Sequence, residues 1–509
     1  MNLKKLMSKV PGRILHFAIV LLAVGGLLGL TSCASAVTRP YDLVLENGRV
    51  MDPESGLDAV RHIGVTDGRI MKISETTLDG NRTINASGLV VAPGFIDLHA
   101  HGQDNKANEY QAMDGVTTAL ELEAGTVGVS DWYASKEGQA VINFGASSSH
   151  PGYRTLVMSG GNREPGEVSD EQWGEMMGDS AWSHEEASPE QLEALLARVE
   201  QGIREGSLGI GTAHQYTPGA RREEIFRIFQ LAKKYNLTVF SHIRYGSAIP
   251  PDSFNAVQEM IANSIASGAP SHICHINSSG GLQTPIALEL IESANHNGVD
   301  ITTEVYPYTA ASTFIGAAIF DEGFQDRIGI SYDAFQWVAS GERLTKESFE
   351  KYRKKEPGGA VVIHFMKPEM VEYAVAHPLV AIASDGLSWE TGGEHPRGAG
   401  TYSRVLGHYV RERGTLPLME ALRKMTLMPA QRLESFVPQM INKGRIREGS
   451  DADITVFNAE TVIDRATFEE PMQYSTGIEY VLVGGTLVVD QGEFVTDVFP
   501  GKAVRRPVQ

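Results

Sequence analysis

Residues 89–102 read Leu89-Val90-Val91-Ala92-Pro93-Gly94-Phe95-Ile96-Asp97-Leu98-His99-Ala100-His101-Gly102. The stretch is a long apolar run, and it ends in two histidines. Successive side chains of a strand point to opposite faces, so His99 and His101 would face the same side. Two imidazoles placed in this way can hold one metal ion. Their position directly after an apolar strand therefore favours a metal site.

The apolar run at 89–98 is the first of about eight, and helical segments lie between several of them. The others are Val116–Leu122, Val141–Phe144, Leu208–Ile210, Leu237–Phe240, Ile273–Ile276, Ile301–Tyr306 and Leu379–Ala383. The clearest helix begins after Ser188, where Pro189 suits the first helical position and Gln191 completes a capping box. A second helix is expected over Glu223–Tyr235. Alternating strands and helices of this number predict a (β/α)8 TIM barrel.

Both ends of the chain have a different pattern, with short β segments. Asn47-Gly48 and Asp67-Gly68 favour two-residue hairpin turns. We expect one small β-sandwich domain formed from both N- and C-terminal segments, residues 33–90 and 436–509. The barrel is expected over residues 91–435. Residues 314–377 fit a single loop poorly, so they are interpreted as an insertion between the seventh and eighth strands that covers the active site.

Composition excludes some classes of protein. The 509 residues are 42% hydrophobic and 21% charged, which is ordinary for a globular protein and rules out disorder as the dominant state. There are 44 basic and 63 acidic residues, a net charge of −19. So acidic a chain repels phosphate backbones, and we expect no nucleic-acid partner.

The N-terminal segment is typical of an export signal. Four basic residues precede an apolar stretch, Ile14–Leu30, and Leu30-Thr31-Ser32-Cys33 follows, which resembles a bacterial lipobox. An ordinary membrane anchor is the alternative, but the stretch is short and contains glycine. We therefore expect residues 1–32 to be a lipoprotein signal peptide and Cys33 to be the lipidation site. The protein would then be tethered to the membrane of a bacterial cell envelope.

Three later strands also end in residues that suit chemistry. His242 follows the fifth strand, His275 the sixth, and Asp385 the eighth. Catalytic groups of such barrels emerge at the C-terminal ends of strands, and Asp385 has the position of a general base. Any single histidine of this kind is more commonly a core residue that bonds to the backbone. Several histidines at successive strand ends favour a functional site instead. His272 is the rival of His275, and alternation places the two on opposite faces. Cys274 is expected to be a small buried residue on the face opposite His275.

This constellation resembles the amidohydrolase superfamily over nearly all of residues 41–509. Within it the chain is similar to the D-aminoacylase family of N-acyl-D-amino-acid deacylases, and particularly to the D-glutamate deacylases. The motifs that carry the resemblance are the stretch 92–101, Gly115-Val116-Thr117-Thr118, Ser384-Asp385-Gly386, Gly449-Ser450-Asp451-Ala452-Asp453, Tyr306-Pro307-Tyr308-Thr309-Ala310-Ala311-Ser312-Thr313, His395-Pro396-Arg397 and Tyr216-Thr217-Pro218-Gly219.

The chain departs from these relatives at three places. The fourth strand, residues 207–212, lacks the lysine that bridges two metals in many of them, and the second strand lacks the cysteine of the D-aminoacylases. A divalent cation still needs an anionic ligand. Glu123 is the first choice because it is nearest the end of the strand, and Glu121 faces the same way. Asn277 stands where relatives often carry a lysine, so the substrate's side chain is left open.

The resemblance implies a zinc-dependent hydrolase of linear amides with one or two Zn²⁺ ions. The metal ligands would be His99, His101, Glu123, His242 and His275. Asp385 would take the proton of the attacking water and return it to the departing amine. Binding of the substrate is assigned to Tyr216, Tyr306, Ser312, Arg397 and Arg244. An arginine suits the α-carboxylate of the product. Arg397 is the first choice for this role, and Arg244 is the second.

The implied substrate is a small-molecule N-acyl-D-amino acid, with N-acyl-D-glutamate as one example. D-specificity follows from the resemblance alone. Two other functions remain open at this point. One is a cyclic-amide hydrolase or isoaspartyl-type dipeptidase of the same superfamily. The other is a non-catalytic tethered binding protein on this fold.

Overall fold

The computed structural model describes residues 40–159, 176, 179–389 and 395–508. Its central feature is a sheet of eight strands in the order β16-β12-β11-β10-β9-β8-β7-β6. The strands are β6 (Phe95–Asp97), β7 (Val116–Thr126), β8 (Asn143–Ser149), β9 (Ile210–Ala213), β10 (Val239–His242), β11 (Ser271–Ile273), β12 (Ile301–Val305) and β16 (Val380–Ile382).

Each neighbouring pair of these strands is parallel. The two outer strands meet just beyond their ends, where the amide of Asp385 lies 2.7 Å from the carbonyl oxygen of His99. A parallel bridge between Ala100 and Gly386 continues this contact. The sheet is therefore nearly closed, and the predicted (β/α)8 barrel is confirmed.

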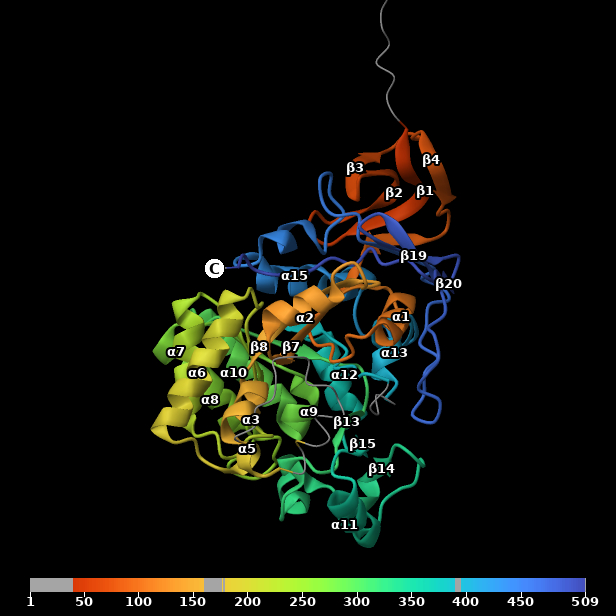
Figure 1. Ribbon diagram of the computed structural model, residues 1–509. Helices are drawn as coiled ribbons and strands as arrows, with labels where there is room; N and C mark the ends of the chain where they lie inside the picture. Colours follow the sequence, from red (N-terminus) through yellow and green to blue (C-terminus); the bar gives the residue numbers. More distant parts are fainter. Residues whose placement is uncertain (1–39, 160–175, 177–178, 390–394, 509) are drawn as a thin grey trace, which may run out of the picture. The chain divides into compact units, whose positions relative to one another are not determined.

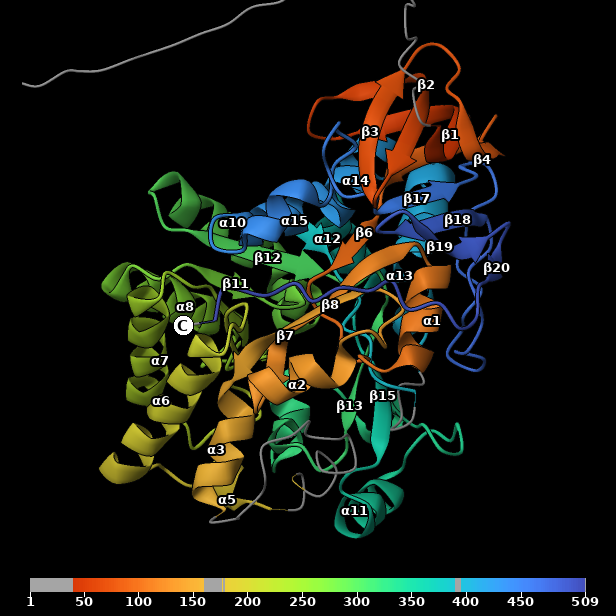
Figure 2. The same cartoon turned by 45° about the horizontal axis from the view of Figure 1, so that its top comes forward.

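Helices connect the barrel strands. Those that pack around it include α1 (Asn105–Met113), α2 (Val129–Lys136), α3 (His150–Met158), α6 (Pro189–Arg204), α7 (Arg222–Lys234), α8 (Ser253–Ser267), α10 (Thr284–His296), α12 (Pro368–Ala376), α13 (Arg397–Arg404), α14 (Leu418–Met425) and α15 (Leu427–Glu434). Figures 1 and 2 show α6, α7 and α8 side by side. The capping box predicted for α6 is present, with Ser188 Oγ accepting from the amide of Gln191. The predicted second helix is α7.

The first apolar run differs from its prediction as a single strand. It divides into β5 (Val90–Pro93), which pairs with strands of the terminal β domain, and β6 in the barrel. The division falls at Gly94. A Cβ atom there would lie 2.2 Å from Oγ1 of Thr117, so only glycine allows the backbone to cross at this point.

The second sheet unites both ends of the chain, as expected for the terminal β domain. Its strands are β1 (Tyr41–Asp52), β2 (Leu57–Thr66), β3 (Arg69–Ser74), β4 (Gly80–Asn85), β5, β17 (Ile454–Phe457), β18 (Ile478–Val483), β19 (Thr486–Asp490) and β20 (Glu493–Phe494). β5 lies between β1 and β17 and so joins the two terminal parts. Asp67-Gly68 forms the predicted hairpin turn, with positive φ at both residues.

Asn47-Gly48 is not a hairpin turn. These residues lie inside β1, where the pairing with β2 shifts register between Leu45 and Gly48. Asn47 has φ +59°, so the pair forms an irregularity of the strand rather than its end. Asn-Gly favours positive φ, and this conformation occurs in β-bulges as well as in hairpin turns.

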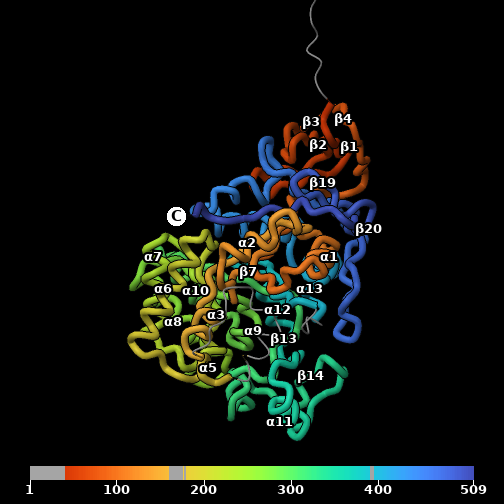
Figure 3. Tube along the Cα trace, viewed as in Figure 1, coloured from red at the N-terminus to blue at the C-terminus, as the bar shows by residue number. Residues whose placement is uncertain are grey.

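A third sheet stands between the seventh and eighth barrel strands in the sequence. It consists of β13 (Ala310–Phe314), β15 (Ala360–His364) and β14 (Phe335–Trp337), in that order, and α11 (Lys346–Lys355) accompanies it. Figures 1 and 3 show α11 and β14 at the end of the molecule away from β1–β4. Residues 310–365 are called the insertion below. α12 follows it and packs against β12 and β16 as a barrel helix.

Residues 1–32 and Cys33, for which an export signal and a lipid are expected, lie outside the described residues.

Candidate metal centre and active site

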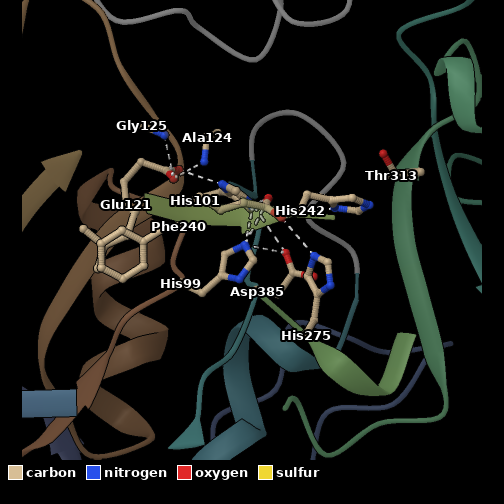
Figure 4. Close-up of polar contacts among 12 residues, drawn as sticks. His99, His101, Glu121, Ala124, Gly125, Phe240, His242, His275, Thr313 and Asp385 are labelled. Atoms are coloured by element: carbon tan, nitrogen blue, oxygen red, sulfur yellow. Dashed lines mark hydrogen bonds and ion pairs between the residues drawn. The ribbon is translucent and has the colours of Figure 1, made fainter. Parts of the chain in front are cut away.

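Six side chains of the predicted site converge at the C-terminal ends of the barrel strands, and Figure 4 labels all of them except Glu123. They are His99 and His101 after β6, Glu123 near the end of β7, His242 at the end of β10, His275 after β11 and Asp385 after β16. The parallel barrel brings these strand ends to one rim, so residues far apart in sequence become neighbours.

Glu123 lies at the centre of the four imidazoles. Its Oε1 is 3.1 Å from Nδ1 of His242 and 2.9 Å from Nε2 of His275. Its Oε2 is 3.3 Å from Nε2 of His99 and 3.5 Å from Nε2 of His101. One carboxylate thus faces two pairs of nitrogen donors.

The donor set fits zinc. Imidazole nitrogens and a carboxylate oxygen are ligands that zinc takes in catalytic sites. Four groups of the described residues each hold three potential ligand atoms within 4.8 Å of one another. Two of them join the predicted ligands: one contains Glu123, His242 and His275, and the other contains His99, His275 and Asp385. The side chains lie close enough for one or two ions.

Glu121, the rival ligand, is placed differently. Its Oε2 lies 2.6 Å from Nδ1 of His101, on the side of the ring away from Glu123. Its Oε1 accepts from the amides of Ala124 and Gly125 at 3.1 and 3.2 Å. Glu121 therefore orients His101 and the end of β7, whereas Glu123 faces the centre.

Asp385 is poised to act as a base. Its Oδ1 is 3.3 Å from Nε2 of both His99 and His101, and its Oδ2 is 2.8 Å from Arg397. Burial by itself would raise the pKa of Asp385, but the Arg397 guanidinium and His99 hold that pKa well below its usual range. The group is consequently a carboxylate, able to accept a proton.

Glu304, on β12, supports the site although no sequence motif marks it. Its Oε1 is 2.5 Å from Nδ1 of His99 and its Oε2 is 3.0 Å from Nε2 of His272. The far nitrogen of His272 is 2.8 Å from the hydroxyl of Thr302. Burial opposes ionisation, but the two histidines lower the pKa of Glu304 to about 2. A glutamate inside a predicted barrel strand was the available signal, because a buried charge is costly without partners.

The expected placement of Cys274 on the face opposite His275 is wrong. β11 ends at Ile273, and His275 has φ +34°, so strand alternation no longer applies beyond that point. Cys274 lies with His99 and Glu123 in a group whose ligand atoms are within 4.8 Å of one another. His272 points instead to Glu304, as described above.

Three of the predicted substrate-binding residues form a polar corner beside Asp385. The Arg397 guanidinium lies 4.8 Å from the centre of the Tyr306 ring and donates to the carbonyl oxygen of Ser312 at 3.3 Å. Tyr306 OH, Ser312 Oγ and Arg397 Nε are buried without a hydrogen-bond partner among the described residues. Each such group costs about 1–3 kcal/mol, so the corner is suited to a polar or anionic ligand.

The remaining two predicted contacts differ from each other. Tyr216 lies in the site: its ring centre is 4.9 Å from that of His242, and its hydroxyl is 2.7 Å from Oγ1 of Thr313. Arg244, expected as the second arginine for the substrate, pairs with Glu259 at 3.0 Å and donates to the carbonyl oxygen of Ala220. Its donors are used within the barrel wall, and it does not line the cavity.

The site opens into a cavity of about 630 Å³. Its lining includes the centre, through His101, Glu123, His242, His275 and Asp385, and the polar corner, through Tyr306 and Ser312. The insertion supplies much of the remaining wall. A volume of this size holds a drug-sized ligand.

Comparison with known proteins finds relatives that match most of the chain. The chain is 29% identical over 490 residues to an N-acyl-D-glutamate deacylase of Alcaligenes xylosoxydans xylosoxydans, covering 91% of this chain and 96% of the relative. It is 28% identical over 514 residues to a D-aminoacylase of the same organism, covering 90% and 96%.

Among solved structures, the fold is similar to an N-acyl-D-glutamate deacylase of Bordetella bronchiseptica in complex with zinc and a phosphonate mimic of the tetrahedral intermediate. The TM-score is 0.77 at 24% identity, covering 92% of this chain and 100% of the other. Residues 82–489 match the Amidohydrolase family. Because that match spans most of the sequence, the chain belongs to the amidohydrolase family.

Proposed function

We propose that the chain is a zinc-dependent hydrolase that cleaves N-acyl-D-amino acids to a carboxylate and a free D-amino acid. The observation that carries the proposal is the polar corner of Tyr306, Ser312 and Arg397 beside Asp385 and the histidine centre. A substrate α-carboxylate placed there would satisfy the buried donors, and the amide bond would then lie toward the centre. The preference for D-compounds rests on the similarity to the two deacylases.

The four histidines and Glu123 would hold the metal. Zinc, when bound, makes water nucleophilic at neutral pH and polarises the acyl carbonyl. Glu123 faces both pairs of imidazoles and so offsets the charge of a cation in either position. Glu304 and Glu121 fix the orientation of His99 and His101 from behind.

Asp385 would serve as the general base and then as the general acid. It accepts the proton of the attacking water and delivers it to the nitrogen of the departing amine. Arg397, which contacts its Oδ2, keeps the carboxylate ionised before the reaction. The hydroxyl of Tyr216, beside His242, is positioned to orient the acyl group.

The test uses purified, zinc-loaded protein and matched pairs of N-acetyl-D- and N-acetyl-L-amino acids. We expect release of free amino acid from the D-compounds and little from the L-compounds. Hydrolysis of only the L-compounds, or of only cyclic amides, would overturn the proposal. Metal analysis of the same preparation reports whether one or two ions are bound.

We also propose that residues 1–32 direct export and that Cys33 carries a lipid that anchors the enzyme in a bacterial cell envelope. Support comes from the basic residues, the apolar stretch and the Leu30–Cys33 motif. Among the described residues, no helix is both long and apolar enough to cross a bilayer. Cells fed labelled palmitate should label the wild-type chain and not Cys33→Ala. Equal labelling of both would contradict the proposal.

A further inference from the structure

A segment of the terminal β domain extends to the surroundings of the polar corner. Residues 463–476, called the arm below, belong to the connection between β17 and β18. An antiparallel bridge between Ile463 and Thr476 joins the two ends of the arm. Figure 1 shows this blue segment running from the terminal sheet toward the insertion. The arm therefore brings side chains of the terminal β domain to a site that is built on the barrel.

Phe468 of the arm lies against two histidines. Its ring centre is 5.1 Å from that of His395, at an interplanar angle of 88°, and 4.9 Å from that of His364 on β15. Its carbonyl oxygen accepts from the side-chain amide of Gln336 on β14 at 3.4 Å. Phe468 thus contacts both the insertion and the segment that carries Arg397, and edge-to-face rings of this kind favour one fixed orientation.

Asp464 attaches the arm to the helix that begins with Arg397. Its Oδ2 is 3.1 Å from the guanidinium of Arg404, at the end of α13, and 3.3 Å from the hydroxyl of Tyr308. The ring of Tyr308 in turn lies edge-on to His395, with ring centres 5.5 Å apart. Both Asp464 and Phe468 are therefore linked to the surroundings of Arg397.

His395 connects this packing to Arg397. The side chain is buried, and its Nδ1 accepts from the amide of Arg397 at 3.1 Å, while its Nε2 donates to the carbonyl oxygen of Ala310 at 2.9 Å. One nitrogen that accepts and one that donates is the pattern of a neutral imidazole. Burial holds the pKa of His395 well below its usual range, which agrees with a neutral ring. His395 thus joins the backbone of Arg397 to the first residue of the insertion.

Phe468 does not line the cavity. Of the described residues that line it, none comes from residues 40–93 or 436–508, the two terminal parts of the chain. The side chain of Phe468 is half-buried, whereas the neighbouring Glu469 and Glu470 are exposed. Any influence of Phe468 on the reaction must therefore pass through the residues that it contacts, and among these His395 leads directly to Arg397.

We infer that Phe468 is a positioning residue for substrate binding. Its ring holds His395, and through His395 the backbone of Arg397, in the orientation in which the guanidinium meets the α-carboxylate of the substrate. The inference rests on the proposed function, in which Arg397 binds that carboxylate. The terminal β domain then contributes to substrate affinity although it supplies none of the described residues that line the cavity.

Phe468→Ala tests this role in the zinc-loaded, full-length enzyme, with the N-acetyl-D-amino acid that the wild type hydrolyses fastest. Loss of the ring should raise KM about two- to tenfold, the factor that corresponds to one aromatic contact, and kcat should change much less. Met472→Ala is the matched control, because Met472 is an apolar residue of the same arm that is 42% exposed. It should leave KM and kcat unchanged. Melting temperature and zinc content verify that each variant has folded.

A double-mutant cycle shows whether the effect passes through Arg397. Lysine keeps the charge but not the planar fork of the guanidinium, so Arg397→Lys removes the group that needs orientation. Addition of Phe468→Ala to Arg397→Lys should then raise KM by clearly less than it does in the wild type. Calorimetric binding of the D-amino acid product gives the same comparison without turnover, should Arg397→Lys be too slow to assay.

The outcomes separate this inference from the proposed function. If the wild type hydrolyses no N-acetyl-D-amino acid, the deacylase function itself fails. If it does, and Phe468→Ala keeps the wild-type KM or lowers only the melting temperature, the deacylase stands and the positioning role of Phe468 is overturned. The same holds if Phe468→Ala weakens binding by an equal factor with and without Arg397, since Phe468 then acts independently of it.

Discussion

Two regions line the same cavity but differ in their side chains. One is the rim, formed by the C-terminal ends of the barrel strands, and the other is the apolar face of the insertion, called the wall. At the rim, carboxylates fix each histidine: Glu304 contacts His99, Glu121 contacts His101, and Glu123 contacts all four. The wall is lined by apolar side chains alone: Phe314, Ile319, Phe320, Ile328, Ile330, Ile363 and Phe365. Polar contacts demand precise geometry, whereas apolar contact tolerates exchange. The comparison shows that the charged and the apolar linings of this cavity come from different segments of the chain.

The largest effect is expected at the rim, from Asp385→Asn. The amide keeps the size of the side chain but cannot accept the proton of the attacking water. We expect kcat to fall by about 10²–10⁴-fold, with the metal content nearly unchanged, as measured by metal analysis of the variant. Full activity in this variant would show that another group acts as the base.

Glu123→Ala and Glu121→Ala compare two glutamates of one strand. Glu123 faces the donors of both pairs, so its loss should remove most of the bound metal and with it the activity. Glu121 orients His101 from behind, and its loss should weaken metal binding by about 10–100-fold. Metal titration of both variants shows which glutamate contributes more to metal affinity. An undiminished metal content in Glu123→Ala would exclude Glu123 as a ligand.

Glu304→Gln tests how far the rim extends into the barrel. The carboxylate holds His99 through Nδ1 and balances His272. We expect about 10–100-fold weaker metal binding. His272→Gln is the companion variant. It changes the contact between His272 and Glu304 but leaves the contact between Glu304 and His99, so it should have the smaller effect. Equal metal affinity in Glu304→Gln and wild type would show that His99 needs no support.

The smallest effect on chemistry is expected from the insertion, where Phe349 stacks on Phe324 with ring centres 5.3 Å apart. Phe349→Ala removes a ring from the core behind the wall and should destabilise the insertion by about 3–5 kcal/mol. Protease susceptibility of the insertion should therefore rise. Hydrolysis of N-acetyl-D-amino acids should change little, and a large loss of this activity would show that the rim depends on the insertion.

Much of the barrel could be predicted because each strand overlaps an apolar run of the sequence and because catalytic groups follow strand ends. This rule identifies His99, His101, His242, His275 and Asp385, and the structure brings them together. Neither Glu304 nor the place of Cys274 follows from it. A partner for a buried charge and a backbone that leaves the strand at positive φ are properties of the folded chain, not of a local pattern.

The residues of the wall could not be predicted from the sequence for a similar reason. Residues 314–377 are predicted to be an insertion over the site, but their sheet begins at Ala310 and pairs β13 with β15 across many intervening residues. Pairing of this kind decides which side chains face the cavity. Arg244 is an example of a residue whose position in the sequence suggested a role that it does not have. It lies two positions beyond His242 but pairs with Glu259 and does not face the cavity.

The crossing at Gly94 has a consequence for how the protein can be divided. The amide of Gly94 donates to the carbonyl oxygen of Asp453, and the side chain of Asp453 accepts from Asn143 on β8. The strand that leads to His99 and His101 thus begins beside the pairing of the terminal β domain. A chain trimmed to the barrel alone would lose the contacts that start its first strand. The catalytic barrel is therefore not a separable module, and the two terminal β segments are part of the enzyme.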